Sequence, residues 1–203
     1  MEEDDWKSER VEAIQESLEF LSTNEQKFER EKWVVARLLE YAVDEFSESF
    51  LSEADEPADV AFLEANFQVK EILEHGRRRS DEYRKALLVA KNAEDFSDLV
   101  SDYNPKFISF CDIVARSHRY AESLVRKYGP REREKLDLVC YFNFNHHHET
   151  PPEKSLEVTH LFRSFAIVSN RYRAVIYATE DAPAFLRESV GKVWDIAGEQ
   201  VPL

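Results

Sequence analysis

The sequence predicts an α/β protein in which helices flank a central mixed β-sheet. Apolar residues recur every three or four positions in the first forty residues and in the middle of the chain, which is typical of helices. Around residues 59–74 and beyond residue 135 they alternate or run continuously over short stretches, which is typical of strands. A composition of 43% hydrophobic residues with only four glycines and seven prolines favours long regular elements around one core.

The first part of the chain predicts two N-terminal helices within residues 8–43. Apolar side chains share one face of residues 8–22 and again of residues 25–43, and a Thr-Asn pair between them can cap the second helix. Phe46–Leu51 fits a short strand. The acidic segment 52–57, which ends in proline, fits a loop.

A core hairpin is predicted over residues 59–74, followed by a helical middle over residues 80–128. Val60 and Phe62 alternate with polar or small residues on the first strand, and Gly76 ends the second. Within the helical middle the expected helices cover residues 81–91, 94–101 and 107–128. The start of the last one, Phe107–Cys111, could instead be a strand.

The rest of the chain predicts C-terminal strands and a helix over residues 135–203. The expected elements are a strand over 136–144, a loop over 145–154, a hairpin of 162–168 and 174–178 turning at Asn170, a helix over 182–190 and a closing segment over 193–196. At 203 residues the chain is long enough for one sizeable core, so we expect a single domain over residues 1–203.

The two cysteines and the lack of long apolar runs indicate where in the cell the protein is expected. Cys111 and Cys140 lie inside apolar segments without metal-ligand spacing, which favours reduced, buried thiols. The first ten residues are acidic, which argues against a signal peptide. No run approaches the roughly 18 apolar residues of a membrane span. We therefore expect a cytoplasmic protein with no membrane association.

Charge is distributed unevenly along the chain. Residues 1–66 hold 20 acidic and 6 basic residues and so carry the whole formal charge of −14. Residues 70–135 hold 15 basic and 12 acidic residues. The acidic N-terminal third could contact a basic partner, and the basic middle permits a phosphate-facing surface without requiring one.

A carboxylate stands on the apolar stripe of the second predicted helix. Glu31 follows Phe28 by three positions and precedes Val35 by four, so it shares their face. A charge on a core-facing stripe is costly unless a cation pairs with it or the helix end lets it reach water. Asp112 and Asp137 also lie in apolar runs, where we expect them to make structural hydrogen bonds.

The core hairpin carries the residues best suited to chemistry. Asp59 opens its first strand, and Gln68 and Lys70 stand two apart on its second, so both point to the face opposite Val69. Carboxylates bind Mg²⁺ or Mn²⁺, a carbonyl or amide oxygen can complete the coordination, and a lysine can polarise a phosphate or a water. The pattern fits metal-assisted hydrolysis of phosphodiester bonds, although the spacing alone is weakly specific.

Three stretches resemble a small bacterial family of unknown function, described as endonucleases with a restriction-endonuclease-like fold. They are KFEREKWVVARLL (27–39), PADVAFLEANFQVKEILEHGRRRSDEYRKAL (57–87) and APAFLRESVG (182–191). The resemblance implies a PD-(D/E)xK arrangement in that fold: an acid on the first helix, an aspartate opening a strand, and an acid-x-lysine on the next. Matched in order, these positions are Glu31, Asp59 and Gln68-Val69-Lys70, with the carbonyl of Val69 as a further metal ligand.

The sequence departs from this arrangement in two places. The proline stands two residues before Asp59, at Pro57, rather than next to it. Gln68 occupies the position where an acid is usual. A glutamine can ligate a metal through its carbonyl oxygen but supplies no charge, so metal affinity should fall.

Arginines after the hairpin are candidates for contact with nucleic acid. Arg77, Arg78 and Arg79 precede a predicted helix, where guanidinium and free backbone N–H groups both favour phosphate, and Arg84 lies within the first turns of that helix. The alternative is that they pair with the acidic N-terminal third.

Two functions therefore follow from the sequence. The first is a Mg²⁺- or Mn²⁺-dependent nuclease-like enzyme acting on DNA, with Asp59, Gln68 and Lys70 as catalytic residues. The second is a module of the same fold without cutting activity, which binds nucleic acid or a protein. A homodimer is compatible with either.

Overall fold

The chain forms two compact units. The computed structural model describes residues 5–74, 76–99, 104–144, 147–153, 158–196 and 200–202. One unit, here called the helical unit, comprises residues 1–30 and 74–104, and the other, the sheet unit, comprises residues 31–73 and 105–203. The expectation of one domain over residues 1–203 stays a prediction.

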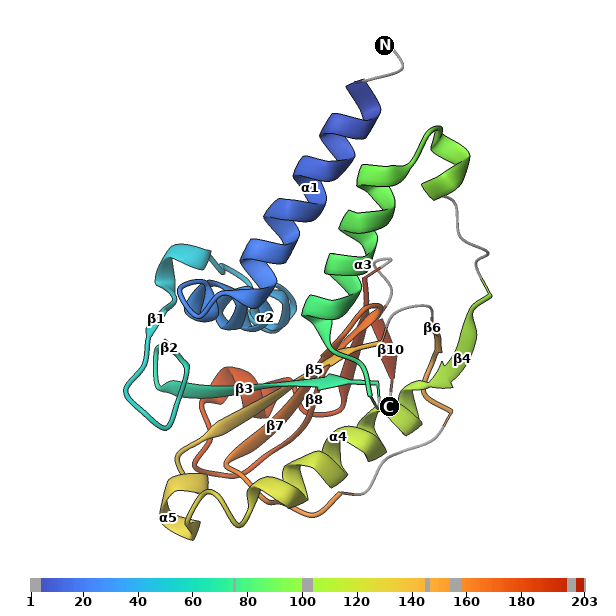
Figure 1. Ribbon diagram of the computed structural model, residues 1–203. Helices are drawn as coiled ribbons and strands as arrows, with labels where there is room; N and C mark the ends of the chain where they lie inside the picture. Colours follow the sequence, from blue (N-terminus) through green and yellow to red (C-terminus); the bar gives the residue numbers. More distant parts are fainter. Residues whose placement is uncertain are drawn as a thin grey trace. The chain divides into compact units, whose positions relative to one another are not determined.

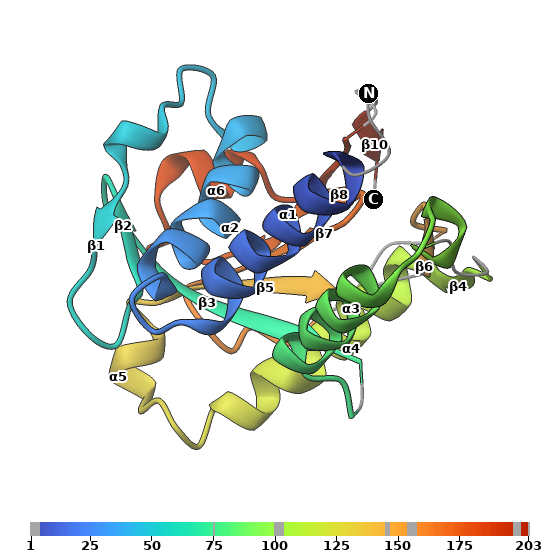
Figure 2. The ribbon, with the colours of Figure 1, turned by 45° about the horizontal axis from the view of Figure 1, so that its top comes forward.

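The helical unit is built on two helices that pack along each other. They are α1 (Asp5–Ser22) and α3 (Arg79–Asn92), which lie side by side in Figures 1 and 2. The ammonium of Lys7 donates a hydrogen bond of 2.7 Å to the carbonyl of Ala93, at the end of α3. A 3₁₀ helix, η2 (Phe96–Leu99), follows within the segment predicted as a helix over 94–101.

The sheet unit contains an eight-stranded mixed sheet. Its strands, in spatial order, are β1 (Ser52–Glu53), β2 (Val60–Phe62), β3 (Ala65–Leu73), β5 (Asp137–Asn143), β7 (Ser164–Ser169), β8 (Tyr172–Ala178), β9 (Lys192–Asp195) and β10 (Gln200–Pro202). The central strands β3, β5 and β7 run parallel, and the other neighbours pair antiparallel. The short helices α5 (Pro130–Arg133) and α6 (Ala184–Glu188) lie in the connections.

Helices cover both faces of this sheet. On α4 (Phe110–Leu124) the side chains of Ile113 and Ala121 join the same buried cluster as Leu138 and Cys140 of β5. On α2 (Lys27–Ala42), Trp33 packs edge-on against Tyr141, which strand alternation points to the opposite face from Cys140. The predicted α/β class with a mixed sheet flanked by helices is confirmed. Among the described residues, no helix combines the length and apolarity needed to span a membrane.

The strand predicted over Phe46–Leu51 is wrong. Glu48–Phe50 forms a 3₁₀ helix, η1, and the strand β1 follows only at Ser52, where a loop was expected. Ser47 explains the difference, because its hydroxyl accepts a hydrogen bond from the N–H of Ser49 and caps the turn.

The segment 107–128 begins as a strand, which was the alternative considered from the sequence. β4 (Lys106–Ser109) ends where the hydroxyl of Ser109 accepts a hydrogen bond of 3.0 Å from the N–H of Asp112 and caps α4. β4 pairs in parallel with β6 (His147–Thr150), which lies where a loop was expected. The partner of each strand is distant in the sequence, so local patterns gave no indication of the pair.

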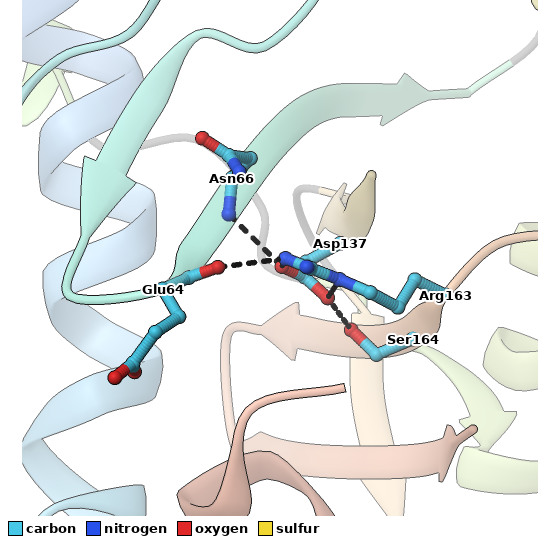
Figure 3. A network of polar contacts seen from close by, with 5 residues as sticks. All are labelled: Glu64, Asn66, Asp137, Arg163 and Ser164. Atoms are coloured by element: carbon cyan, nitrogen blue, oxygen red, sulfur yellow. Dashed lines mark hydrogen bonds and ion pairs between the residues drawn. The ribbon is translucent and has the colours of Figure 1, made fainter. Parts of the chain in front are cut away.

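A buried carboxylate joins the three parallel strands where they begin (Figure 3). Asp137, fully buried, accepts hydrogen bonds from the N–H of Asn66 at 2.9 Å, from the Ser164 hydroxyl at 2.8 Å and from Nε and Nη2 of Arg163. Arg163 Nη2 also donates to the carbonyl of Glu64 at 3.0 Å. The expected structural role of Asp137 is confirmed.

Replacing Asp137 tests how much of the fold depends on this network. Asp137→Asn leaves the guanidinium of Arg163 without its counter-charge in a buried position, so we expect the free energy of unfolding to fall by about 3 kcal/mol. Urea denaturation followed by circular dichroism measures it. The exposed Asp181→Asn is the control, expected to change stability by less than about 0.5 kcal/mol. Similar values for the two variants would show that the network is dispensable.

Candidate functional site

Asp59 lies at the edge of β3, just before β2 begins. Its main-chain N–H donates to the carbonyl of Phe67 at 2.8 Å, and its carboxylate oxygen Oδ2 accepts from the N–H of Val69 at 2.9 Å. β2 pairs with β3 only as far as Phe67, so this carboxylate satisfies a strand-edge N–H beyond the last paired residue. The side chain of Asp59 is 7% exposed.

Gln68 connects Asp59 to the segment after α4. The amide nitrogen of Gln68 donates to Oδ2 of Asp59, and its carbonyl oxygen accepts from the hydroxyl of Tyr128. Gln68 and Tyr128 are each 3% exposed. Both polar ends of this buried amide therefore have a partner, as a buried polar group requires.

Lys70 completes the group. Its ammonium nitrogen is 3.8 Å from Oδ2 of Asp59 and donates to the carbonyl of Val69 at 2.9 Å. Lys70 is the cross-strand partner of Cys140, so the two side chains share a face of the sheet. Burial raises the pKa of the Cys140 thiol to about 12, against a smaller opposing effect of the Lys70 charge. This thiol stays protonated, which agrees with the expectation of a buried, reduced cysteine.

The oxygens of this group are not arranged as ligands for a divalent cation. A single oxygen of Asp59 faces three N–H donors, the carbonyl of Gln68 accepts from Tyr128, and the carbonyl of Val69 accepts from Lys70. Among the described residues, no three His, Cys, Asp or Glu side chains are grouped so that they could hold a metal. As it stands, the donor set does not fit Mg²⁺ or Mn²⁺.

Glu31 lies on a helix that packs on the other face of the sheet. It lies on α2, whose Trp33 packs on Tyr141, while Gln68 and Lys70 point to the face covered by α4. Asp59, Gln68 and Lys70 thus converge, whereas Glu31 belongs to a helix on the opposite face. Its role as a metal ligand stays a prediction.

The four arginines proposed to bind nucleic acid belong to the helical unit. The side chain of Arg77 is 6% exposed and forms an ion pair of 2.6 Å with Glu82, and Arg84 lies 3.8 Å from Asp81. Arg78 is the residue before α3, and the side chain of Arg79 lies outside the described residues. These two acids lie on α3 itself, and pairing with the acidic N-terminal third stays a prediction. DNA contact by these arginines stays a prediction.

Tyr128 is the site residue that sequence reasoning missed. It precedes a Gly-Pro pair that marks the end of a helix, and it lies 60 positions from Gln68. A buried glutamine on a strand requires a donor for its carbonyl oxygen, but nothing in the local sequence indicates which residue supplies it.

The fold and this group define an α/β protein with a polar site on the parallel part of a mixed sheet. The chain belongs to the family described as "Putative endonuclease, protein of unknown function (DUF1780)", which matches residues 2–200. A solved structure from Pseudomonas aeruginosa strain PAO1 is similar over 97% of both chains, with 23% identity and a TM-score of 0.64. That protein, PA4535, is described as of unknown function and of the monooxygenase superfamily. No curated protein matches the chain.

The hydroxyl of Tyr128 can be removed with little change in shape. In Tyr128→Phe the carbonyl oxygen of Gln68 stays buried without a donor, so we expect the free energy of unfolding to fall by about 2 kcal/mol. The ring contact of Tyr128 with Phe162 is kept in this variant. Tyr120→Phe, at a 38% exposed tyrosine, is the matched control for urea denaturation. Equal stability of the two variants would exclude Tyr128 as the necessary donor.

Proposed function

We propose that this protein is a nuclease-like module that binds nucleic acid without metal-dependent cutting. One observation carries the proposal: the position where the PD-(D/E)xK arrangement has an acid holds an amide whose N–H points at the Asp59 carboxylate. A donor there replaces the negative charge that a divalent cation needs. The Asp59 carboxylate can only accept, which favours this orientation of the amide, and the Tyr128 hydroxyl then donates to its carbonyl oxygen.

The nuclease-like part of the proposal rests on the hairpin. Asp59 opens one strand, Gln68 and Lys70 follow on its neighbour, and Lys70 lies within ion-pair distance of Asp59. This placement supports the two strand positions of the arrangement that the family resemblance implies, while the helix position, Glu31, stays a prediction. The family description supports an origin among endonucleases. The restriction-endonuclease-like assignment of the mixed sheet is part of the same proposal.

A second candidate is an endonuclease that hydrolyses DNA phosphodiester bonds, as the family description suggests. The ammonium of Lys70 favours it, because this group is 19% exposed and lies 3.8 Å from a carboxylate, where it could polarise a phosphate oxygen. Glu31, Asp59, Gln68 and Val69 would be the metal-binding residues. Oxygens of Asp59, Gln68 and Val69 accept hydrogen bonds in this arrangement, so a metal would have to displace these donors. A homodimer and a basic partner for the acidic N-terminal third remain predictions.

Plasmid DNA and metal titrations separate the two candidates. We expect the wild-type protein to retard supercoiled plasmid in a gel without nicking it, in Mg²⁺ or Mn²⁺, and to give no heat of Mn²⁺ binding. Gln68→Glu adds a carboxylate beside Asp59, so we expect this variant to give a measurable heat of Mn²⁺ binding, with an affinity at least about tenfold above the detection limit of the calorimeter. Gln15→Glu adds the same charge at an exposed position of α1 and should bind no Mn²⁺.

Other outcomes are equally informative. Nicking by the wild type that disappears in both Asp59→Ala and Lys70→Ala would establish the endonuclease and overturn the first candidate. Nicking that persists unchanged in both variants would identify a contaminating nuclease. A wild-type protein that neither retards nor nicks the plasmid would remove both candidates.

A further inference from the structure

A row of four side chains crosses the sheet on the face covered by α2. Tyr141 of β5 pairs with Val168 of β7, Val168 pairs with Arg173 of β8, and Arg173 pairs with Trp194 of β9. Residues directly opposite each other on neighbouring strands point to the same face. Arg173 therefore stands in the middle of this face, and it is only 6% exposed.

A stripe of α2 runs over this row. Trp33, Arg37 and Tyr41 are spaced four apart and share one side of the helix. The Trp33 ring lies 5.5 Å from that of Tyr141 at one end of the row, and the Tyr41 ring lies 6.2 Å from that of Trp194 at the other. Arg37, midway between these aromatic pairs, lies over the middle of the row, and its guanidinium is 5.7 Å from the Trp33 ring centre. Arg37 and Arg173 thus both lie between the two aromatic pairs, near enough that the charge of Arg37 acts on Arg173.

Within the part of the chain that the structure describes, no carboxylate binds Arg173 directly. Nη1 of Arg173 donates to the carbonyls of Ser169 and Tyr172, and its buried Nε has no hydrogen-bond partner among those residues. Glu149 acts on this charge from a distance, but its carboxylate accepts from the Ser169 hydroxyl and from two main-chain N–H groups. A buried guanidinium held only by neutral carbonyls is costly.

Arg37, which is nearer the surface, also has a buried Nε that lacks a hydrogen-bond partner among the described residues. Its Nη atoms lie 3.2 Å from Glu40 and 3.7 Å from Glu48. Both ion pairs involve partly exposed carboxylates and are weak, so another anion can compete for the guanidinium. Burial lowers the pKa of Arg173. Tyr41, Glu149 and Tyr141 oppose this effect, and the positive charge of Arg37 makes the smallest contribution, a lowering one. The guanidinium remains charged at neutral pH. An anion placed here would relieve the repulsion between the two arginines.

We propose that Arg37 and Arg173 form a binding site for a phosphate ester, carried by a nucleotide or by single-stranded nucleic acid. Guanidinium groups suit phosphate oxygens, and aromatic rings stack on bases. Trp33 and Tyr41 are 39% and 36% exposed, so each offers a ring face or edge beside the arginines. The site lies on the opposite face of the sheet from Gln68 and Lys70. It goes beyond the proposed function, because it does not require the Asp59 group.

Tryptophan fluorescence provides the readout, since Trp33 and Trp194 lie in the site and Trp6 lies in the helical unit. We expect thymidine monophosphate to quench the emission of the wild type with saturation, and thymidine, which lacks the phosphate, to bind at least about tenfold more weakly. Arg37→Gln and Arg173→Lys should each weaken binding of the monophosphate by about tenfold or more. Arg84→Gln, at a 67% exposed arginine of the helical unit, is the matched control and should bind as the wild type does.

The source of the phosphate is settled by a parallel titration with a single-stranded oligothymidine. Tighter binding of the oligonucleotide than of the monophosphate assigns the site to nucleic acid, and equal or weaker binding assigns it to nucleotides. If Arg173→Lys fails to fold by circular dichroism, Arg37→Gln carries the test alone. Unchanged fluorescence with every phosphate-bearing probe, or equal affinity of Arg37→Gln and the wild type, would overturn the proposal. If the wild type does not retard the plasmid but still binds the monophosphate, the nucleic-acid-binding module proposed above is excluded and the phosphate site at Arg37 and Arg173 is kept.

Discussion

The hydrogen-bonded carboxylate of Asp137 is the interaction on which the arrangement of the sheet depends. It joins the first residues of three parallel strands through Asn66, Arg163 and Ser164. Because Asn66 lies two positions before Gln68, fixing the start of β3 also fixes which side chains of that strand face α4. A shift of one residue would exchange the two faces of the strand. The geometry of the candidate site therefore depends on the structural hydrogen bonds around Asp137.

The group around Asp59 is complete as a structural unit. Its negative charge lies 3.8 Å from the ammonium of Lys70, and the polar atoms of Gln68 are paired at both ends. In a catalytic metal site, by contrast, carboxylate oxygens are left for the metal and negative charges accumulate until the metal binds. Because Gln68 is neutral, the group carries one negative charge fewer than it would with an acid at this position. This difference is the reason why we propose a module that binds without metal-dependent cutting.

The sheet carries polar groups on both faces, which is uncommon for strands buried between helices. On the α4 face the charges of Asp59 and Lys70 neutralise each other. On the α2 face Arg173 is buried with carbonyl partners, and its acidic neighbour Glu149 is engaged elsewhere. The Asp59 group pairs its polar atoms internally, whereas on the α2 face Nε of Arg37 and Nε of Arg173 are buried without a hydrogen-bond partner among the described residues. Buried groups that lack a partner point to a ligand more directly than those that have one.

The sequence by itself determined the α/β class, the main helices, the hairpin and the convergence of Asp59, Gln68 and Lys70, because each follows from periodicity over a few residues. Tertiary structure alone decided the pairing of β4 with β6, the partner of Gln68 and the row from Tyr141 to Trp194. These contacts join residues that are distant in the chain, and they are fixed by strand register and helix packing. It also placed Glu31 on a helix across the sheet from Lys70, since a helical stripe shows that a residue faces the sheet but not which face it meets.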